Sequence, residues 1–177
     1  MAVRSIVRMG DPLLLKVADL ITDFNTPELN ALVGDLIDTM QALNGAGIAA
    51  PQIGVSQQVV IFGGFKSSRY PDVPEIPFTV LCNPTLTLLG DEIEEDWEGC
   101  LSVPGMRGLV PRQRKLRYQG YDAQGQQIDR TVTDFHARVV QHECDHLFGI
   151  LYPMRIQDLR NFGFSDAITP NSPVDEE

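Results

Sequence analysis

The pattern HExxH occupies residues 142–146 of the chain. On an α-helix, His142 and His146 lie about one turn apart on the same face, so both imidazole rings can reach one metal ion. Glu143 projects beside the first histidine, where its carboxylate can take a proton from a water molecule that the metal activates. The spacing therefore predicts a metal-dependent hydrolytic site. The alternative is a chance match on a helix that buries two histidines in the core.

The residues around this pattern predict a helix that begins at Thr131 or Thr133 and ends before Gly149. Threonine is a good N-cap, and glycine suits the left-handed position just after a helix. At about 100° per residue, Phe135 and Val139 fall on the same stripe as the two histidines. The nearly opposite side carries Ala137, Val140, Cys144 and Leu147. A helix that is apolar on two sides is expected to be buried, with one side in the core and the other at a site.

Catalytic zinc-like sites usually have three protein ligands and one open position, so a third ligand is needed. The extended metallopeptidase pattern HExxHxxGxxH would place a histidine at position 152, where this chain has Tyr152. No histidine follows His146 in the sequence, and Asp158 and Asp166 are weak downstream alternatives. The third ligand is therefore expected upstream.

The upstream candidates are His136 and the cysteines at 82, 100 and 144. His136 and Cys144 point away from the stripe of the HExxH histidines, and Cys82 lies in an apolar strand, so we interpret these three as structural. Cys100 instead lies in the polar, glycine-flanked segment EGCLS at residues 98–102. A Cys100 thiolate with two imidazoles would form a tetrahedral site with one open position.

The 177 residues, 43% of them hydrophobic, are enough for one globular domain with a substantial core. We expect this domain to cover residues 1–164 and to be followed by an acidic, flexible tail at residues 165–177. The sequence lacks an apolar run of about 18 residues, the length that can span a membrane, and its N-terminus does not resemble a signal peptide. Three cysteines cannot all pair, so a reducing cytoplasm is the expected location.

The net charge of −10 argues against DNA and anionic membranes as partners, because both require a basic patch. Part of this charge is concentrated in one short segment. Its acidic residues are Asp91, Glu92, Glu94, Glu95, Asp96 and Glu98. Acidic runs usually lie on a solvated surface, and we interpret most of these residues in that way.

The hydrophobic patterns predict an α+β fold, in which small mixed or antiparallel sheets pack around a central buried helix that carries HExxH. Pro27 after Thr26 marks the start of another helix, whose apolar residues keep the helical period as far as Gly45. The predicted strands are 59–62, 79–82, 85–89, 93–97, 115–121, 127–132 and 151–155, with a surface loop at 66–77.

The chain closely resembles the peptide deformylase family in three motifs that occur in the family's order. The first motif, GxGxAAxQ, corresponds to residues 45–52, the second, EGCLS, to residues 98–102, and the third, QHExDH, to residues 141–146. The likeness extends from Val7 to about Phe164. Three motifs in order are far more specific than any one of them.

This resemblance implies a hydrolase that removes the N-formyl group from the initiator methionine of newly made polypeptides and releases formate. It also implies that Cys100, His142 and His146 hold the metal and that Glu143 is the general base and acid. Gln52 and the backbone N–H of Leu101 would bind the formyl oxygen as it gains charge. Preorganised donors of this kind contribute a large part of catalysis.

A formyl group is small, so we expect a cramped site beside a pocket for an unbranched apolar side chain. Phe135 and Val139 precede His142 on its own face and are the expected pocket walls. Gly45 and Gly47 would let the substrate backbone approach closely, as an added strand, and Arg107 matches a family arginine near the substrate. The expected substrate-binding residues are Gly45, Ala46, Gly47, Gly99, Arg107, Phe135 and Val139.

One divalent ion is expected, and a Cys/His/His set suits zinc, cobalt, nickel or ferrous iron. The resemblance implies ferrous iron. The expected partners are N-formylmethionyl nascent peptides, and a monomer is expected. Because residues 165–177 contain no Lys or Arg, docking on the ribosome through a basic tail is not expected, although action on nascent chains is.

Three alternatives remain at the level of sequence. One is an HExxH metallopeptidase, which the missing downstream ligand disfavours. Another is a non-catalytic domain with a structural metal, which would have no need for Glu143 or Gln52. The third is a deformylase relative that acts on other N-acylated amino acids.

Overall fold

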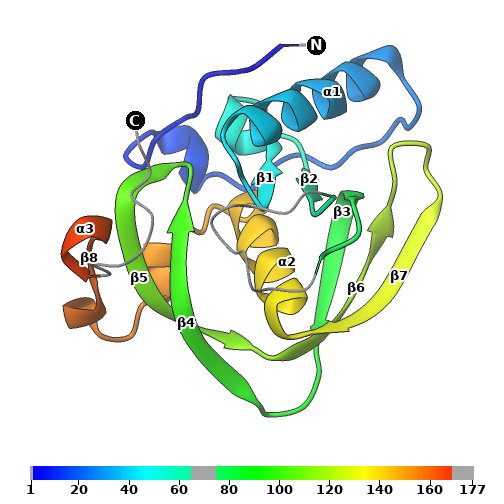
Figure 1. The fold of residues 1–177 in the computed structure, drawn as a ribbon. Coiled ribbons are helices and arrows are strands. Elements are labelled where there is room, and N and C mark those ends of the chain that lie inside the picture. Colours follow the sequence, from blue (N-terminus) through cyan, green and yellow to red (C-terminus); the bar gives the residue numbers. More distant parts are fainter. Residues whose placement is uncertain (1, 65–74, 169–177) are drawn as a thin grey trace.

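The computed structural model describes residues 2–64 and 75–168, which form two antiparallel sheets and a few helices (Figure 1). The five-stranded sheet has the order β1 (Gly47–Ala49), β2 (Val59–Phe62), β3 (Thr79–Leu88), β6 (Lys115–Tyr121), β7 (Gln127–Thr133). The three-stranded sheet has the order β4 (Ile93–Cys100), β5 (Val103–Gln113), β8 (Phe162–Phe164). All neighbouring strands in these sheets pair antiparallel. The predicted α+β class is therefore confirmed.

The two longer helices begin where the sequence predicts. Helix α1 (Pro27–Ala42) has Pro27 in its first turn, and the Thr26 hydroxyl accepts a hydrogen bond from the Leu29 amide at 3.1 Å. Helix α2 (Asp134–Leu147) follows Thr133 and contains the HExxH residues. The other helical segments are α3 (Ser165–Ile168) and the 3₁₀ turns η1 (Pro12–Leu15), η2 (Ala50–Ile53), η3 (Tyr152–Arg155) and η4 (Leu159–Asn161).

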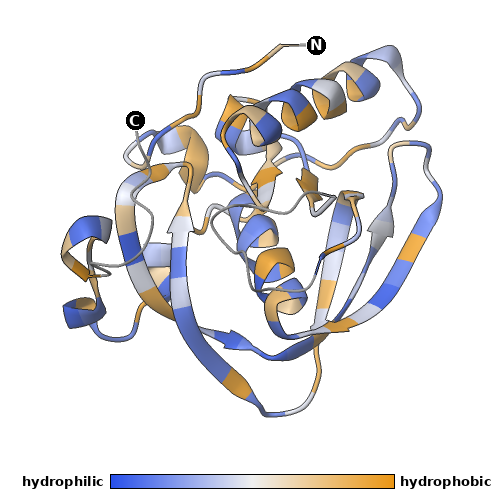
Figure 2. Cartoon of the chain, in the orientation of Figure 1, coloured by the Kyte–Doolittle hydropathy of each residue, from blue (hydrophilic) through white to orange (hydrophobic). Residues whose placement is uncertain are grey.

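Both faces of the five-stranded sheet are covered by a helix. Along β2, Val60 and Phe62 join the core cluster that contains the apolar residues of α2, whereas Val59 and Ile61 join the cluster that contains those of α1. This alternation follows from the two-residue period of a strand. Figure 2 shows hydrophobic residues along β2 and mostly hydrophilic ones along β4. The five-stranded sheet is thus the hydrophobic centre of the fold.

Helix α2 lies between the two sheets (Figure 1) and contacts each with a different kind of side chain. Its apolar side packs on the five-stranded sheet. Its polar residues Arg138 and Gln141 donate hydrogen bonds to β5, at 2.9 Å to the Val110 carbonyl and 2.8 Å to the Gln113 carbonyl. Because these buried polar groups have partners, α2 can be enclosed on both sides.

Three strand predictions require correction. The predicted strands 79–82 and 85–89 form the single strand β3, whose register with β6 shifts between Cys82 and Thr85. The predicted strand at 151–155 is wrong: residues 152–155 form η3, because a proline in the first turn favours a helical start. The sequence does not predict β5, because its four Pro and Gly residues are unusual within a strand and interrupt the expected pattern.

Two predicted segments fall partly outside the described residues. Residues 66–74 of the surface loop predicted at 66–77 lie outside the described part of the chain. The tail predicted at 165–177 begins with α3 (Ser165–Ile168), a short helix that the sequence does not predict, and residues 169–177 lie outside the described part.

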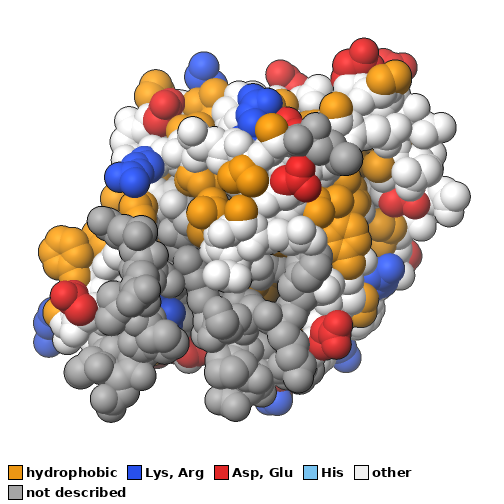
Figure 3. All heavy atoms as spheres, turned by 45° about the horizontal axis from the view of Figure 1, so that its top comes forward, with side chains coloured by type: hydrophobic (Ala, Val, Ile, Leu, Met, Phe, Trp, Pro, Cys, Tyr) orange, Lys and Arg blue, Asp and Glu red, His pale blue; other side chains and the backbone are white. Residues whose placement is uncertain are grey.

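The surface of the described residues mixes charged and apolar side chains. On the face shown in Figure 3, hydrophobic side chains lie in several places between acidic ones, and the visible Lys and Arg side chains are scattered. No helix among the described residues has both the length and the apolar character needed to cross a membrane.

Gly149 follows the end of α2 and packs closely against Leu15 of η1. Its φ is 72°, and a Cβ at this position would lie 2.4 Å from the Leu15 carbonyl oxygen. We expect Gly149→Ala to lower the free energy of unfolding by about 3 kcal/mol, from backbone strain together with this clash, as measured by chemical denaturation.

Gly90→Ala is the matched control. Gly90 has a φ of 75°, but no atom lies within 4 Å of its Cβ position. Only the left-handed backbone is then penalised, at about 1 kcal/mol. Equal losses in the two variants would show that the contact with Leu15 does not constrain the fold.

Candidate metal centre

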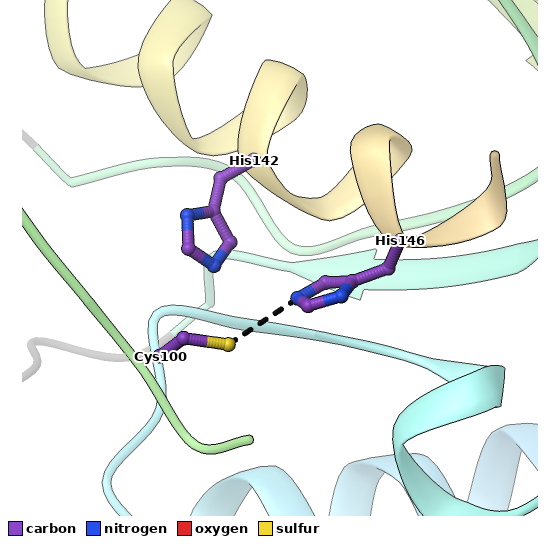
Figure 4. A group of neighbouring side chains, drawn as sticks. All are labelled: Cys100, His142 and His146. Atoms are coloured by element: carbon purple, nitrogen blue, oxygen red, sulfur yellow. Dashed lines mark hydrogen bonds between the residues drawn. The ribbon is translucent and has the colours of Figure 1, made fainter. Parts of the chain in front are cut away.

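Cys100, His142 and His146 form one compact group (Figure 4). The two imidazoles project from successive turns of α2 toward the cysteine at the end of β4. One ligand atom from each residue lies within 4.8 Å of the others, and Cys100 Sγ is 3.3 Å from His146 Nε2. One thiolate and two imidazoles are a donor set that binds zinc-like ions, so the group fits a divalent metal.

The other candidate ligands are held elsewhere. Burial raises the pKa of Cys82 to about 12 and also raises that of Cys144, so both thiols stay protonated in the core. His136 packs against the rings of Phe62 and Tyr118, and burial lowers its pKa to about 4.

The downstream carboxylates also lie apart from this group. Asp158 pairs with Arg160, at 2.6 Å, and Asp166 belongs to α3. Neither joins the Cys/His/His group in the described part of the chain. Tyr152, at the position of the missing metallopeptidase histidine, stacks on His142 with ring centroids 6.1 Å apart. The tyrosine therefore supports a ligand instead of replacing one.

Glu98 orients His142. The Nδ1 atom of His142 lies 2.8 Å from Glu98 Oε2, so Nδ1 donates to this carboxylate and Nε2 is left for the metal. Arg112 binds the same carboxylate through two nitrogens, at 2.8 and 2.9 Å, and Arg138 binds it at 2.9 Å. Burial alone would raise the pKa of Glu98, but the hydrogen bonds from Arg112 and His142 outweigh it and hold the pKa far below its usual range.

The network continues through Asp145 to η3. Arg112 also binds Asp145, at 2.6 Å, and Asp145 binds Arg155 of η3 at 2.7 Å. Sequence reasoning missed this role, because Glu98 ends an acidic run interpreted as mostly solvated. The Glu98 side chain is only 5% exposed. The one available signal was its place directly before Gly99 and Cys100 in EGCLS.

Glu143 lies beside the metal group. Its side chain is buried, and its Oε2 has no hydrogen-bond partner among the described residues. A Cβ on Gly47 would lie 2.6 Å from Glu143 Oε1, so only glycine fits at position 47. Burial raises the pKa of Glu143 to about 7 and the charge of Glu98 adds to this, although His142 and Arg112 oppose it. A carboxyl group with such a pKa can exchange protons near neutral pH.

A small cavity of ≈ 50 Å³ opens onto this group. Most of the predicted site residues line it: Gly45, Ala46, Gly47, Gln52, Gly99, Cys100, Leu101, Phe135, Val139, His142 and Glu143. His146 lies behind it in the metal group, and the half-exposed Arg107 is not part of its lining but approaches Gly99. The cavity also contacts Trp97, Glu98 and Arg138, which sequence reasoning did not place at the site.

Known proteins are similar to this chain in sequence and in fold. A family model described as polypeptide deformylase matches residues 3–162. The chain is 65% identical over 175 residues to peptide deformylase 1 of Nitrosomonas europaea, covering 99% of each chain, and 60% identical over 172 residues to peptide deformylase 2 of Ralstonia nicotianae, covering 97% of each. The structure resembles the Met-Ala-Ser-bound class I type b peptide deformylase of Acinetobacter baumannii, with a TM-score of 0.84, 37% identity, and coverage of 88% of this chain and 99% of that one.

The Glu98 contacts predict that its charge supports the metal ligands. We expect Glu98→Gln to weaken metal binding by roughly 10- to 100-fold, because the amide pairs poorly with Arg112 and no longer holds His142 in one orientation. Competition with a chromogenic chelator measures this affinity directly.

Glu92→Gln is the control for this measurement. Glu92 pairs with Arg114 on an exposed part of the surface, so its substitution should leave metal affinity unchanged. Wild-type affinity in Glu98→Gln would contradict the orienting role.

Proposed function

The chain belongs to the polypeptide deformylase family, and on this premise we propose that Cys100, His142 and His146 hold the family's metal ion while Glu143 moves the proton. The family's reaction, removal of the N-formyl group from newly made polypeptides, is the hydrolysis of an amide. The observation that carries the proposal is the buried Glu143 carboxylate, which has an unpartnered oxygen beside the Cys/His/His group. Helix α2 is then the catalytic helix, with HExxH held between the sheets.

The chain's own residues account for the proton transfers and for charge stabilisation. A bound divalent ion supplies Lewis acidity, which makes water nucleophilic near neutral pH. Glu143 accepts a proton from the attacking water and later gives it to the leaving amine, so that the C–N bond breaks and formate is released. Gln52 Nε2 and the Leu101 N–H donate hydrogen bonds to the formyl oxygen as negative charge builds on it.

The shape of the cavity supports selection of the formyl group. Its volume of ≈ 50 Å³ is sufficient for a few water molecules or a small acyl group. Phe135 and Val139 form apolar walls for the methionine side chain, and the glycines at 45, 47 and 99 admit the peptide backbone. Arg107 lies near Gly99, where it can contact the peptide beyond methionine. The A. baumannii relative binds Met-Ala-Ser, a peptide of the kind that this reaction produces.

We propose ferrous iron as the native ion, with zinc, nickel and cobalt as functional substitutes, because the Cys/His/His set accepts all four. Residues 1–164 form the catalytic domain. The enzyme acts as a monomer in the cytoplasm on N-formylmethionyl nascent chains, without DNA or membrane partners.

Two rival functions are weaker. A metallopeptidase with the extended HExxH pattern needs a ligand at position 152, where Tyr152 stacks on His142. A purely structural metal site is closed by its ligands, whereas this group opens onto a cavity with Glu143 at its wall. Neither rival explains why Glu143 Oε2 has no hydrogen-bond partner among the described residues.

The test is formate release from formyl-Met-Ala-Ser by iron- or nickel-loaded protein without oxygen. We expect Glu143→Gln to lose activity by roughly 100- to 10,000-fold, as proton transfer fails, while its metal content stays that of the wild type. The N-acetyl peptide should not be cleaved by either protein.

Glu28→Gln on α1 is the control, because Glu28 is an exposed carboxylate in the first turn of that helix. It should keep full activity. If Glu143→Gln released formate at the wild-type rate, the assignment of Glu143 would be wrong. Rapid cleavage of the acetyl peptide would instead overturn the small acyl site.

A further inference from the structure

The carboxamide of Gln52 has a single orientation in the structure. Its side chain is only 2% exposed, and its oxygen lies 2.9 Å from the Ala49 amide. Because a backbone N–H can only donate, the atom facing Ala49 must be the oxygen Oε1. The NH₂ group is therefore directed away from Ala49, toward Cys100, whose Sγ lies 3.4 Å from Nε2.

Ser102 accepts a hydrogen bond from one of the two N–H bonds of this NH₂ group and thereby sets the direction of the other. The Ser102 side chain is fully buried, and its Oγ lies 3.2 Å from Gln52 Nε2. The amide group is planar, so Ala49 at one end and Ser102 at the other fix its plane. With one N–H given to Ser102, the other donates to Cys100 Sγ in this structure and faces the side where the formyl oxygen would arrive.

The main chains of Gln52 and Ser102 are joined by a segment far from both in sequence. The Val7 amide donates to the Gln52 carbonyl at 2.8 Å, and the Met9 amide donates to the Ser102 carbonyl at 2.7 Å. Residues 7–9 are named here the N-terminal strap. The strap therefore links η2 to the turn that joins β4 to β5.

The chain just before the strap is attached to α1. The Arg4 amide donates to Thr39 Oγ1 at 2.9 Å, and the Ala2 amide donates to Asp35 Oδ1 at 2.8 Å. The chain before the strap thus follows α1 before it crosses to the site. These anchors make the strap a fixed part of the fold.

We propose that Ser102 and the N-terminal strap are positioning elements for Gln52, which they hold so that one N–H of its carboxamide points at the developing oxyanion. This inference depends on the role proposed above for Gln52 and adds residues to it. Ser102 does not touch the substrate; it acts through the Gln52 amide.

The first experiment compares Ser102→Ala with Thr79→Val, using formyl-Met-Ala-Ser and metal-loaded enzyme. Thr79 is the matched control, since it is also buried and its hydroxyl is hydrogen-bonded outside the site, to Pro77 and Arg130. We expect Ser102→Ala to lower kcat about tenfold, less than the ~100-fold or larger loss when an oxyanion donor is removed outright. KM should change by less than about twofold and metal content not at all, whereas Thr79→Val should retain kcat.

The second measurement does not depend on activity. In ¹⁵N-labelled, zinc-loaded protein, Gln52→Glu identifies the side-chain NH₂ signals of Gln52 by their disappearance. These signals should shift and exchange faster with solvent in Ser102→Ala and in Met9→Pro, which lacks the strap's second amide donor. Val3→Pro, which places proline in the segment before the strap, should leave them unchanged.

The outcomes separate this inference from the proposed function. If Gln52→Glu keeps the wild-type kcat, the proposed role of Gln52 fails, whatever Ser102→Ala does. If Gln52→Glu is impaired but Ser102→Ala keeps the wild-type kcat and Gln52 signals, only the positioning role is overturned. If Thr79→Val loses as much kcat as Ser102→Ala, the effect is general destabilisation and the inference is likewise overturned.

Discussion

The buried carboxylate of Glu98 is the interaction on which the site depends. It receives hydrogen bonds from Arg112 on the neighbouring strand and from Arg138 and His142 on α2. Removing a charge from water costs several kcal/mol unless partners compensate for it, so this carboxylate is stable only when all three partners are present. The same contacts that make burial possible attach β4 to α2. Folding and the orientation of His142 are thus one event.

Because Glu98 and Cys100 lie on the same strand, fixing one places the other. Cys100 reaches the two histidines only when β4 lies against the polar side of α2, while the apolar side of the helix packs on the five-stranded sheet. The metal group therefore forms between the two sheets, where Cys100 of β4 lies next to His142 and His146 of α2. Its small cavity follows from that enclosure.

Close packing also decides what each acidic or amide group at the site can do. Gly47 lies so near Glu143 that a larger residue would displace the carboxylate. Glu143 Oε2 has no hydrogen-bond partner among the described residues, whereas both carboxylate oxygens of Glu98 accept hydrogen bonds from neighbouring side chains. The first carboxyl group can therefore exchange protons and the second can only hold a charge. Gln52 belongs to a third kind, a neutral donor whose direction is set by what surrounds it.

The sequence alone determined the helix start at Thr26, a second helix carrying HExxH that starts at Thr131 or Thr133, and the grouping of Cys100 with His142 and His146. Capping, periodicity and ligand chemistry are properties of residue types and their local spacing. It also determined the family, through three short motifs. Tertiary structure alone decided that Glu98 is buried although it ends an acidic run, and that a segment rich in Pro and Gly becomes β5. Glu98 depends on Arg112 and Arg138, 14 and 40 residues away, and the pairing of β5 depends on β4 and β8. Burial and strand pairing are set by such distant partners, which no local pattern encodes.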